Sequence, residues 1–265
     1  MGAFRRICLL ALLAACCFGS TPALAEERVA LVIGNGAYKN LPRLDNTVGD
    51  AQAMSELLKS FGFKVTLGTD LTREKMSALM REFGKTTADA DIALVYYAGT
   101  GVALDDSEYF LPVDASIKTE SDIRLGATID LNAAIDQILW PANVKLVFVD
   151  APRTNPFPGR MTACHPALPG PREPSGEPSP ENSFIVFATG PGQEILDGEE
   201  GSHRPFTQAL LENIAVPGVE IGEMMTKVRA RVTELTNKGQ MPWGSSNLIT
   251  LVYLNPNPPA PAGAK

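Results

Sequence analysis

Covalent cleavage of an acyl bond needs a nucleophile with a base beside it, and few side chains of this sequence can serve. The two histidines are His165 and His203, and Cys164 is the one cysteine beyond residue 20. A thiolate next to an imidazole could form such a pair, but adjacent side chains usually point apart, and this stretch is rich in proline and glycine. We therefore disfavour a Cys164–His165 dyad and interpret His203 as a solvated loop residue.

Two polar segments stand where apolar runs end. Residues 92–97 are followed by Ala98-Gly99-Thr100-Gly101, and residues 144–149 by Asp150-Ala151-Pro152-Arg153. Ligands of open parallel sheets bind beyond the carboxyl ends of the strands, and glycines at a strand end permit close backbone approach. These two segments are therefore the favoured place for a site. The plain alternative is a pair of turns that lead into the next elements.

Strand and helix patterns alternate along the chain and must position these segments. Apolar runs predict strands, and apolar residues at helical spacing predict helices between them, with Thr72 and Asp130 as N-caps. Runs without polar alternation, separated by amphipathic helices, indicate an α/β fold with a mostly parallel sheet covered on both faces. The expected strands are 28–33, 63–67, 92–97, 144–149, 183–188 and 247–254. The expected helices lie within 51–61, 72–83, 130–139, 205–213 and 220–236.

Composition excludes several classes of protein. The 265 residues are 45% hydrophobic and 20% charged, with a net charge of −7, which is typical of a globular protein. An acidic balance disfavours nucleic acid as a partner, because phosphate binding needs clustered cations. Two histidines and scattered acids offer no metal-ligand spacing, so we predict no metal and no other cofactor.

The first 25 residues have the pattern of a secretory signal. Arg5 and Arg6 precede an apolar run at 7–18, and Ala23-Leu24-Ala25 matches a cleavage site. The run is too short to span a bilayer, so we predict a periplasmic or secreted protein with no membrane span. A competing interpretation is the lipobox-like Leu13-Ala14-Ala15-Cys16, which would leave Cys16 lipidated. After either cleavage one domain follows at 26–254, with a long loop at 152–182 and a flexible Pro-rich tail at 255–265.

Several motifs in one order resemble the bacterial caspase-like cysteine peptidases of the metacaspase type. The strongest are Tyr96-Tyr97-Ala98-Gly99-x-Gly101 and Asp150-Ala151-x-Arg153-x-Asn155-Pro156-Phe157. Further matches include Tyr109-Phe110-Leu111-Pro112-Val113-Asp114, Asp197-Gly198, Pro205-Phe206-Thr207 and Gln240-x-Pro242-Trp243. The resemblance covers nearly all of the chain after the signal. It implies a caspase-type three-layer sandwich, with a six-stranded, mainly parallel sheet and helices on both faces.

The catalytic dyad that the resemblance implies is a His between the two glycines and a Cys after Asp-Ala. This sequence has Thr100 and Pro152 at those positions. A threonine hydroxyl is no base near neutral pH, and proline has neither a thiol nor a backbone N–H for an oxyanion. We therefore predict no catalytic residue, with Thr100 and Pro152 as vestigial dyad positions.

The resemblance also implies a pocket for a substrate Arg or Lys, lined by Asp50 and Asp150, with Gly101 as a third substrate-binding residue. The plain alternatives are a carboxylate at a helix N-terminus for Asp50 and a strand-end cap for Asp150. Our first hypothesis is a catalytically inactive pseudo-peptidase that binds basic peptides or scaffolds partners. The alternatives are an active cysteine endopeptidase that cleaves after Arg or Lys with a non-standard nucleophile, and a purely structural module. The sequence does not identify the partner, the oligomeric state or a role for calcium.

Overall fold

The computed structural model describes residues 26–104, 107–155, 181–199 and 201–256. A six-stranded sheet forms its centre, in the order β2-β1-β3-β7-β8-β9. Five strands are mutually parallel and β9 is antiparallel to β8. The bounds are β1 Arg28–Gly34, β2 Lys64–Thr69, β3 Ile92–Ala98, β7 Val144–Asp150, β8 Ser183–Phe187 and β9 Trp243–Ser246. The prediction of a six-stranded, mainly parallel sheet is confirmed.

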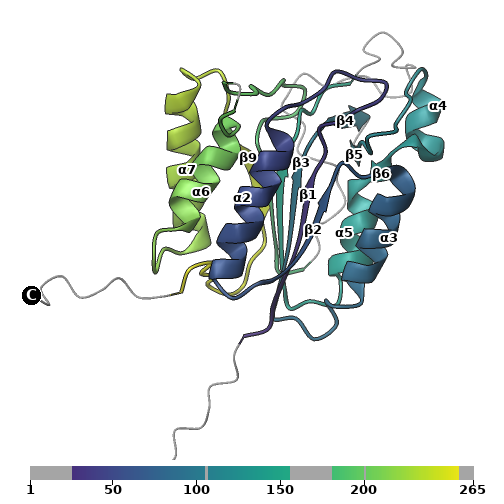
Figure 1. The fold of residues 1–265 in the computed structure, drawn as a ribbon. Coiled ribbons are helices and arrows are strands. Elements are labelled where there is room, and N and C mark those ends of the chain that lie inside the picture. Colours follow the sequence, from purple (N-terminus) through teal and green to yellow (C-terminus); the bar gives the residue numbers. More distant parts are fainter. Residues whose placement is uncertain (1–25, 105–106, 156–180, 200, 257–265) are drawn as a thin grey trace, which may run out of the picture.

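Helices cover both faces of this sheet. Figure 1 shows α2, α6 and α7 on one side and α3 and α5 on the other. Successive residues of a strand point to opposite faces, so Leu94 and Tyr96 of β3 enter one apolar layer, while Val95 and Tyr97 enter the other. The helix bounds are α2 Thr47–Ser60, α3 Arg73–Gly84, α5 Leu131–Leu139, α6 Pro205–Ile214 and α7 Ile221–Leu235.

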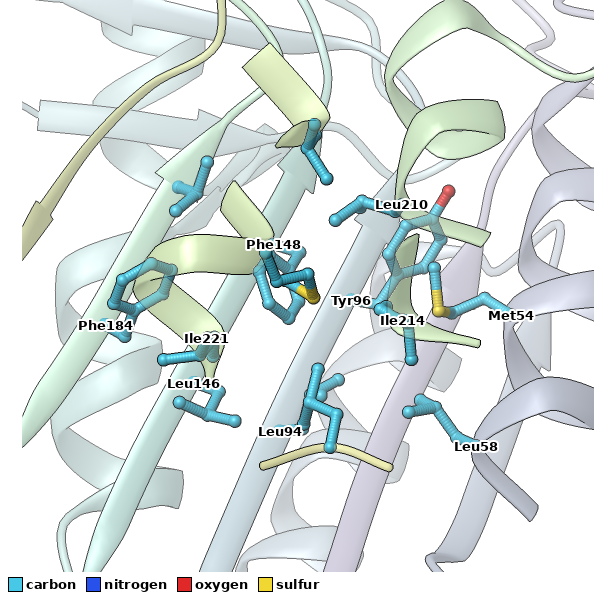
Figure 2. Close-up of a cluster of buried hydrophobic side chains, with 14 of the residues drawn as sticks. Met54, Leu58, Leu94, Tyr96, Leu146, Phe148, Phe184, Leu210, Ile214 and Ile221 are labelled. Carbon is cyan, nitrogen blue, oxygen red and sulfur yellow. The ribbon is translucent and has the colours of Figure 1, made fainter. Parts of the chain in front are cut away.

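The first layer is built from side chains of β3, β7 and β8 together with those of the three covering helices. Figure 2 shows Leu94 and Tyr96 beside Met54 and Leu58 of α2 and Ile214 of α6. Each of these five side chains is at most 1% exposed. Burial of this kind is the main favourable contribution to folding, and it fixes the strands whose ends carry the candidate site.

A second, three-stranded sheet lies beyond the end of β3 and was not expected from the sequence. It consists of β4 (Gly101–Leu104), β5 (Ser107–Phe110) and β6 (Ile129–Asp130). The short helices α4 (Glu120–Asp122) and η2 (Ile123–Ala127) stand between β5 and β6. Gly101, the first residue of β4, therefore belongs to a hairpin that starts directly at the end of β3.

One local prediction is wrong. The last strand is β9, and residues 247–254 are irregular because other parts of the chain use their polar groups. Arg28 donates to the carbonyls of Tyr253 and Leu254, and Ile221 N–H donates to the Val252 carbonyl at 2.9 Å. Asp130 caps α5 by accepting from Ala133 N–H at 3.0 Å, as predicted. Thr72 stands at the N-cap of α3, as predicted, but makes no side-chain cap bond.

Candidate functional site

Three strand ends meet at one edge of the main sheet. Gly34 of β1 is level with Ala98 of β3, which is level with Asp150 of β7. The chain runs from β1 to β2 on one side and then to β3 on the other, so the connections diverge at β1 and β3. This is the place where ligands of doubly wound sheets bind. The predicted site segments follow β3 and β7 there.

The two predicted dyad positions lie on adjacent segments. A side-chain carbon at Gly101 would stand 2.9 Å from the Pro152 carbonyl oxygen, and Ala103 N–H donates to the Thr154 carbonyl at 3.1 Å. Thr100 and Pro152 are both partly exposed. Gly101 is thus needed for the close approach of two backbone segments. The substrate-binding role predicted for it remains a prediction.

Thr100 is held through its backbone. Its N–H donates to the Tyr38 hydroxyl at 2.7 Å, and its carbonyl accepts from the Tyr97 hydroxyl at 2.9 Å. Burial raises the pKa of both tyrosines, so both hydroxyls stay neutral at physiological pH. These two hydrogen bonds fix the position of residue 100 but supply no base.

The described residues contain no cysteine, and their one histidine is His203. Cys164 and His165 lie outside the described residues, as do the signal segment with Cys16, residues 156–180 of the predicted loop and residues 257–265 of the predicted tail. At the ends of β3 and β7 the side chains are therefore a hydroxyl at Thr100 and a pyrrolidine ring at Pro152. Neither group is a thiolate nucleophile or an imidazole base.

Asp150, the last residue of β7, is fully buried. Its Oδ2 accepts from the Thr207 hydroxyl at 2.5 Å, and the Tyr96 hydroxyl lies 2.5 Å from the same Thr207 oxygen. Since Thr207 gives its proton to Asp150, Tyr96 must donate to Thr207 in this arrangement. Burial raises the pKa of Asp150, and the nearby guanidinium of Arg204 and the Thr207 bonds oppose that rise.

Asp50, in the first turn of α2, is also fully buried. Its Oδ1 lies 2.7 Å from Nδ1 of His203, and its Oδ2 accepts from Arg204 N–H at 3.4 Å. Burial and the neighbouring Asp150 charge raise the pKa of Asp50 to about 7, although the hydrogen bond from His203 opposes the rise. His203, interpreted as a solvated loop residue, is 39% exposed but has this buried partner.

Arg204 is the residue that sequence reasoning missed. Pro205 begins α6, and a residue before proline is driven to extended backbone, which keeps Arg204 outside the helix. Its side chain is 1% exposed and its Nη1 donates to the carbonyls of Gly99 at 3.2 Å and Asp150 at 2.9 Å. Nη2 donates to Asp197 Oδ1 at 2.5 Å. The guanidinium therefore sits directly at the ends of β3 and β7.

A family model that describes the caspase domain matches residues 27–253. The chain belongs to the caspase domain family.

Two curated relatives share this domain in part. Mucosa-associated lymphoid tissue lymphoma translocation protein 1 of Homo sapiens and its homolog from Mus musculus are each 36% identical to the chain over 92 residues. That stretch is 35% of this chain and 11% of each relative, so the chain spans only a small part of their length. Among solved structures, caspase-1 from Spodoptera frugiperda has a TM-score of 0.61 at 20% identity, covering 87% of this chain and 91% of that chain. This likeness confirms the predicted fold.

In this caspase domain, Asp50 and Asp150, the two acids predicted to bind a basic substrate, lie close to each other, and we call them the acidic site. Their partners come from the same chain. Asp50 faces His203, and Asp150 faces Arg204 and Thr207. The structure thus fills the acidic site with an internal cation. Pro205 after Arg204 indicated only that Arg204 precedes a helix. A polar loop sequence gives no indication that an arginine in it is buried.

Arg153, next to the predicted dyad position, also has a structural partner. Its guanidinium pairs with Glu108 of β5, with an Nε–Oε1 distance of 2.7 Å, and lies 3.9 Å from the ring centroid of Phe187. Burial raises the pKa of Glu108, an effect that the charge of Arg153 opposes. This pair ties the segment after β7 to the small sheet.

Two further findings bear on the predicted partners. Among the described residues, no three His, Cys, Asp or Glu side chains are grouped so that they could hold a metal ion. No helix in the described part of the chain is both long enough and apolar enough to cross a membrane.

Proposed function

We propose that this caspase-domain protein is catalytically inactive and acts by binding or scaffolding protein partners outside the cytoplasm. The observation that carries the proposal is the pair Thr100 and Pro152 on adjacent segments at the ends of β3 and β7. A cysteine peptidase needs a thiolate and a base at such a place. Proline also removes one backbone donor, and loss of a single oxyanion donor costs about 3 kcal/mol of transition-state stabilisation in characterised proteases.

The acidic site supports a scaffold in preference to a free receptor for basic peptides. A peptide arginine would have to reach Asp50 and Asp150, which have no exposed surface. Arg204 already occupies the space between Gly99 and Asp197. In this proposal, partner proteins contact other surfaces of the domain, and basic peptides gain access only when Arg204 is displaced.

The test is turnover of fluorogenic peptides that end in Arg or Lys, with the exported protein and its Cys164→Ala variant. We expect both proteins to give the rate of the blank. Turnover that disappears in Cys164→Ala would overturn the proposal in favour of an active endopeptidase with a non-standard nucleophile. The intact mass of the exported protein then distinguishes soluble export from lipidation at Cys16.

Calorimetric titration separates scaffolding from peptide binding. We expect no saturable heat when Arg- or Lys-terminated peptides are added to the wild-type protein, because the acids are engaged. Saturable binding that Asp150→Asn abolishes would instead support a peptide receptor. A purely structural role would be favoured if cross-linking of the protein in its own compartment, followed by mass spectrometry, joined it to no other protein.

A further inference from the structure

The acids at the ends of β3 and β7 form a cluster with an unusual charge balance. Asp50 and Asp150 are completely buried, and Asp197 stands beside them with 59% of its side chain exposed. The cations that face them are Arg204, which is buried, and His203, which is partly exposed. Since burial of an unpaired carboxylate is costly, a cation at this place stabilises the ionised form of these acids.

The contacts of Arg204 show which cation the site accepts. Nη1 donates to two strand-end carbonyls, of Gly99 and Asp150, and Nη2 donates to the Asp197 carboxylate. These acceptors are served by two different terminal nitrogens of one planar group, whereas the three donors of an ammonium radiate from a single nitrogen. The surroundings therefore favour a guanidinium over a lysine.

The internal guanidinium leaves part of the site unused. Oδ1 of Asp150 is buried without a hydrogen-bond partner and lies 3.9 Å from Nη1 of Arg204. Nε of Arg204 is likewise buried without a partner. A carboxylate oxygen with no donor, 3.9 Å from a guanidinium nitrogen, indicates that the site has more acceptor capacity than the tethered Arg204 satisfies. A ligand free of the backbone at residue 204 could turn to use that oxygen.

We infer that Asp150, Asp197 and the Gly99 carbonyl form a guanidinium-binding site that the chain's own Arg204 occupies, and that loss of the Arg204 side chain opens it to an external alkylguanidinium. The inference deepens the proposed function, since it names the ligand class that the acidic site takes. The inference concerns binding and not catalysis. Thermal unfolding therefore tests it, whereas peptide turnover tests the proposed function. An external arginine side chain and Arg204 exclude each other, because both need the carbonyls of Gly99 and Asp150.

The experiment is thermal unfolding of Arg204→Ala with ethylguanidinium chloride, compared with ethylammonium chloride and sodium chloride at equal ionic strength. At about ten times its Kd, ethylguanidinium should raise the Tm of Arg204→Ala by about 3–5 °C. Wild type should not respond, because its site is full. Arg204→Met should not respond either, because methionine fills the space without supplying a charge.

A second control tests whether removal of any arginine that lies between two acids makes the Tm respond to ethylguanidinium. Arg231 pairs with Glu212 and Glu234 on the surface and is 33% exposed. Arg231→Ala removes the same charge from between two carboxylates but leaves no enclosed space, so we expect no response to ethylguanidinium. A stabilisation of Arg204→Ala that ethylammonium or Arg231→Ala reproduces would overturn the inference, as would the absence of any stabilisation.

Should Arg204→Ala not fold by itself, the same comparison is made on refolding yield after dilution from urea. Ethylguanidinium must then raise the yield of Arg204→Ala severalfold over ethylammonium and leave the Arg204→Met yield unchanged. The wild-type protein gives an independent measurement, because acetyl-arginine amide should show no saturable heat with it. Binding to wild type that Asp150→Asn removes would show that Arg204 does not occupy the site.

Discussion

Replacement of Asp50 by asparagine should change how stability depends on pH. Asp50 is buried between the Asp150 carboxylate, the His203 ring and the Arg204 backbone N–H. Burial first, and the charge of Asp150 second, raise the pKa of Asp50 from 3.8 to about 7 in the folded protein. Asparagine is nearly the same size and has no proton to lose, so it should remove this titration while leaving the packing in place.

The sign follows from proton binding in the two states. Between the unfolded pKa near 3.8 and the folded pKa near 7, the unfolded chain has released the Asp50 proton and the folded chain retains it. Stability therefore falls as pH rises through this window and is constant above it. Each pKa unit corresponds to about 1.4 kcal/mol, so the full contribution is about 4 kcal/mol.

The measurement is urea unfolding of wild type and Asp50→Asn between about pH 4.5 and 8, where the titration lies. The free energy of unfolding of wild type, minus that of Asp50→Asn, should decrease by a few kcal/mol across this range. Asp45→Asn is the matched control, because Asp45 is 59% exposed and on the same stretch of chain. Its difference from wild type should be nearly independent of pH.

His203 provides a second test of the same reasoning. Its hydrogen bond through Nδ1 is the largest contribution that opposes the rise in the Asp50 pKa, ahead of the Arg204 backbone N–H. In His203→Gln the pKa of Asp50 should rise further, and the break in the stability curve should move to higher pH. The argument would be refuted by a wild-type minus Asp50→Asn difference that is constant with pH, or that increases as pH rises.

Two other substitutions test the packing that supports the site. Phe206→Ala, which empties a fully buried position of α6, should lower the free energy of unfolding by about 3–5 kcal/mol; a loss below about 1 kcal/mol would mean that the layer under α6 is not packed as described. Glu108→Gln leaves the buried Arg153 without its anionic partner and should cost about 3 kcal/mol by the same urea assay. An unchanged unfolding midpoint for Glu108→Gln would show that the pair does not hold the segment after β7.

The central strands could be predicted because burial on both faces shows directly in the composition of their sequences. Residues of β1, β3 and β7 are buried on both faces, and such strands read as continuous apolar runs. The placement of a site in the segments after β3 and β7 followed from the same fact, since ligands of parallel sheets bind beyond the carboxyl ends of the strands. No contact between distant side chains had to be known for either prediction.

The shorter strands give no such signal in their sequences. β4 and β5 have four residues each and β6 has two, which is too few for a periodic pattern to emerge. The apolar run near residues 247–254 was a misleading signal, because its carbonyls are taken by Arg28 and Ile221 instead of a neighbouring strand. Hydrogen-bond partners more than 30 residues away decide such cases, and local sequence does not contain them.

Arg204 shows the same limit within the site. The preceding Gly201-Ser202-His203 is typical of an exposed loop. The acceptors of its guanidinium include Gly99, 105 residues away, and Asp150, 54 residues away. Only the folded sheet brings these groups around one arginine. Asp50 and Asp150 were named because the resemblance to the metacaspase type implies them as pocket residues. Arg204 was not named, because its role depends on contacts that only the folded chain makes.

The filled acidic site and the predicted loss of the dyad have a common physical logic. Buried acids such as Asp50 and Asp150 can remain ionised only if a cation compensates them, and a peptidase that cleaved after a basic residue would receive that cation from each substrate. A chain that no longer turns over substrate has no such supply, and an internal arginine gives permanent compensation. Arg204 would then stabilise the fold by the same contacts through which it excludes an arginine from outside, so stability and peptide access at this site must change in opposite directions when residue 204 is substituted.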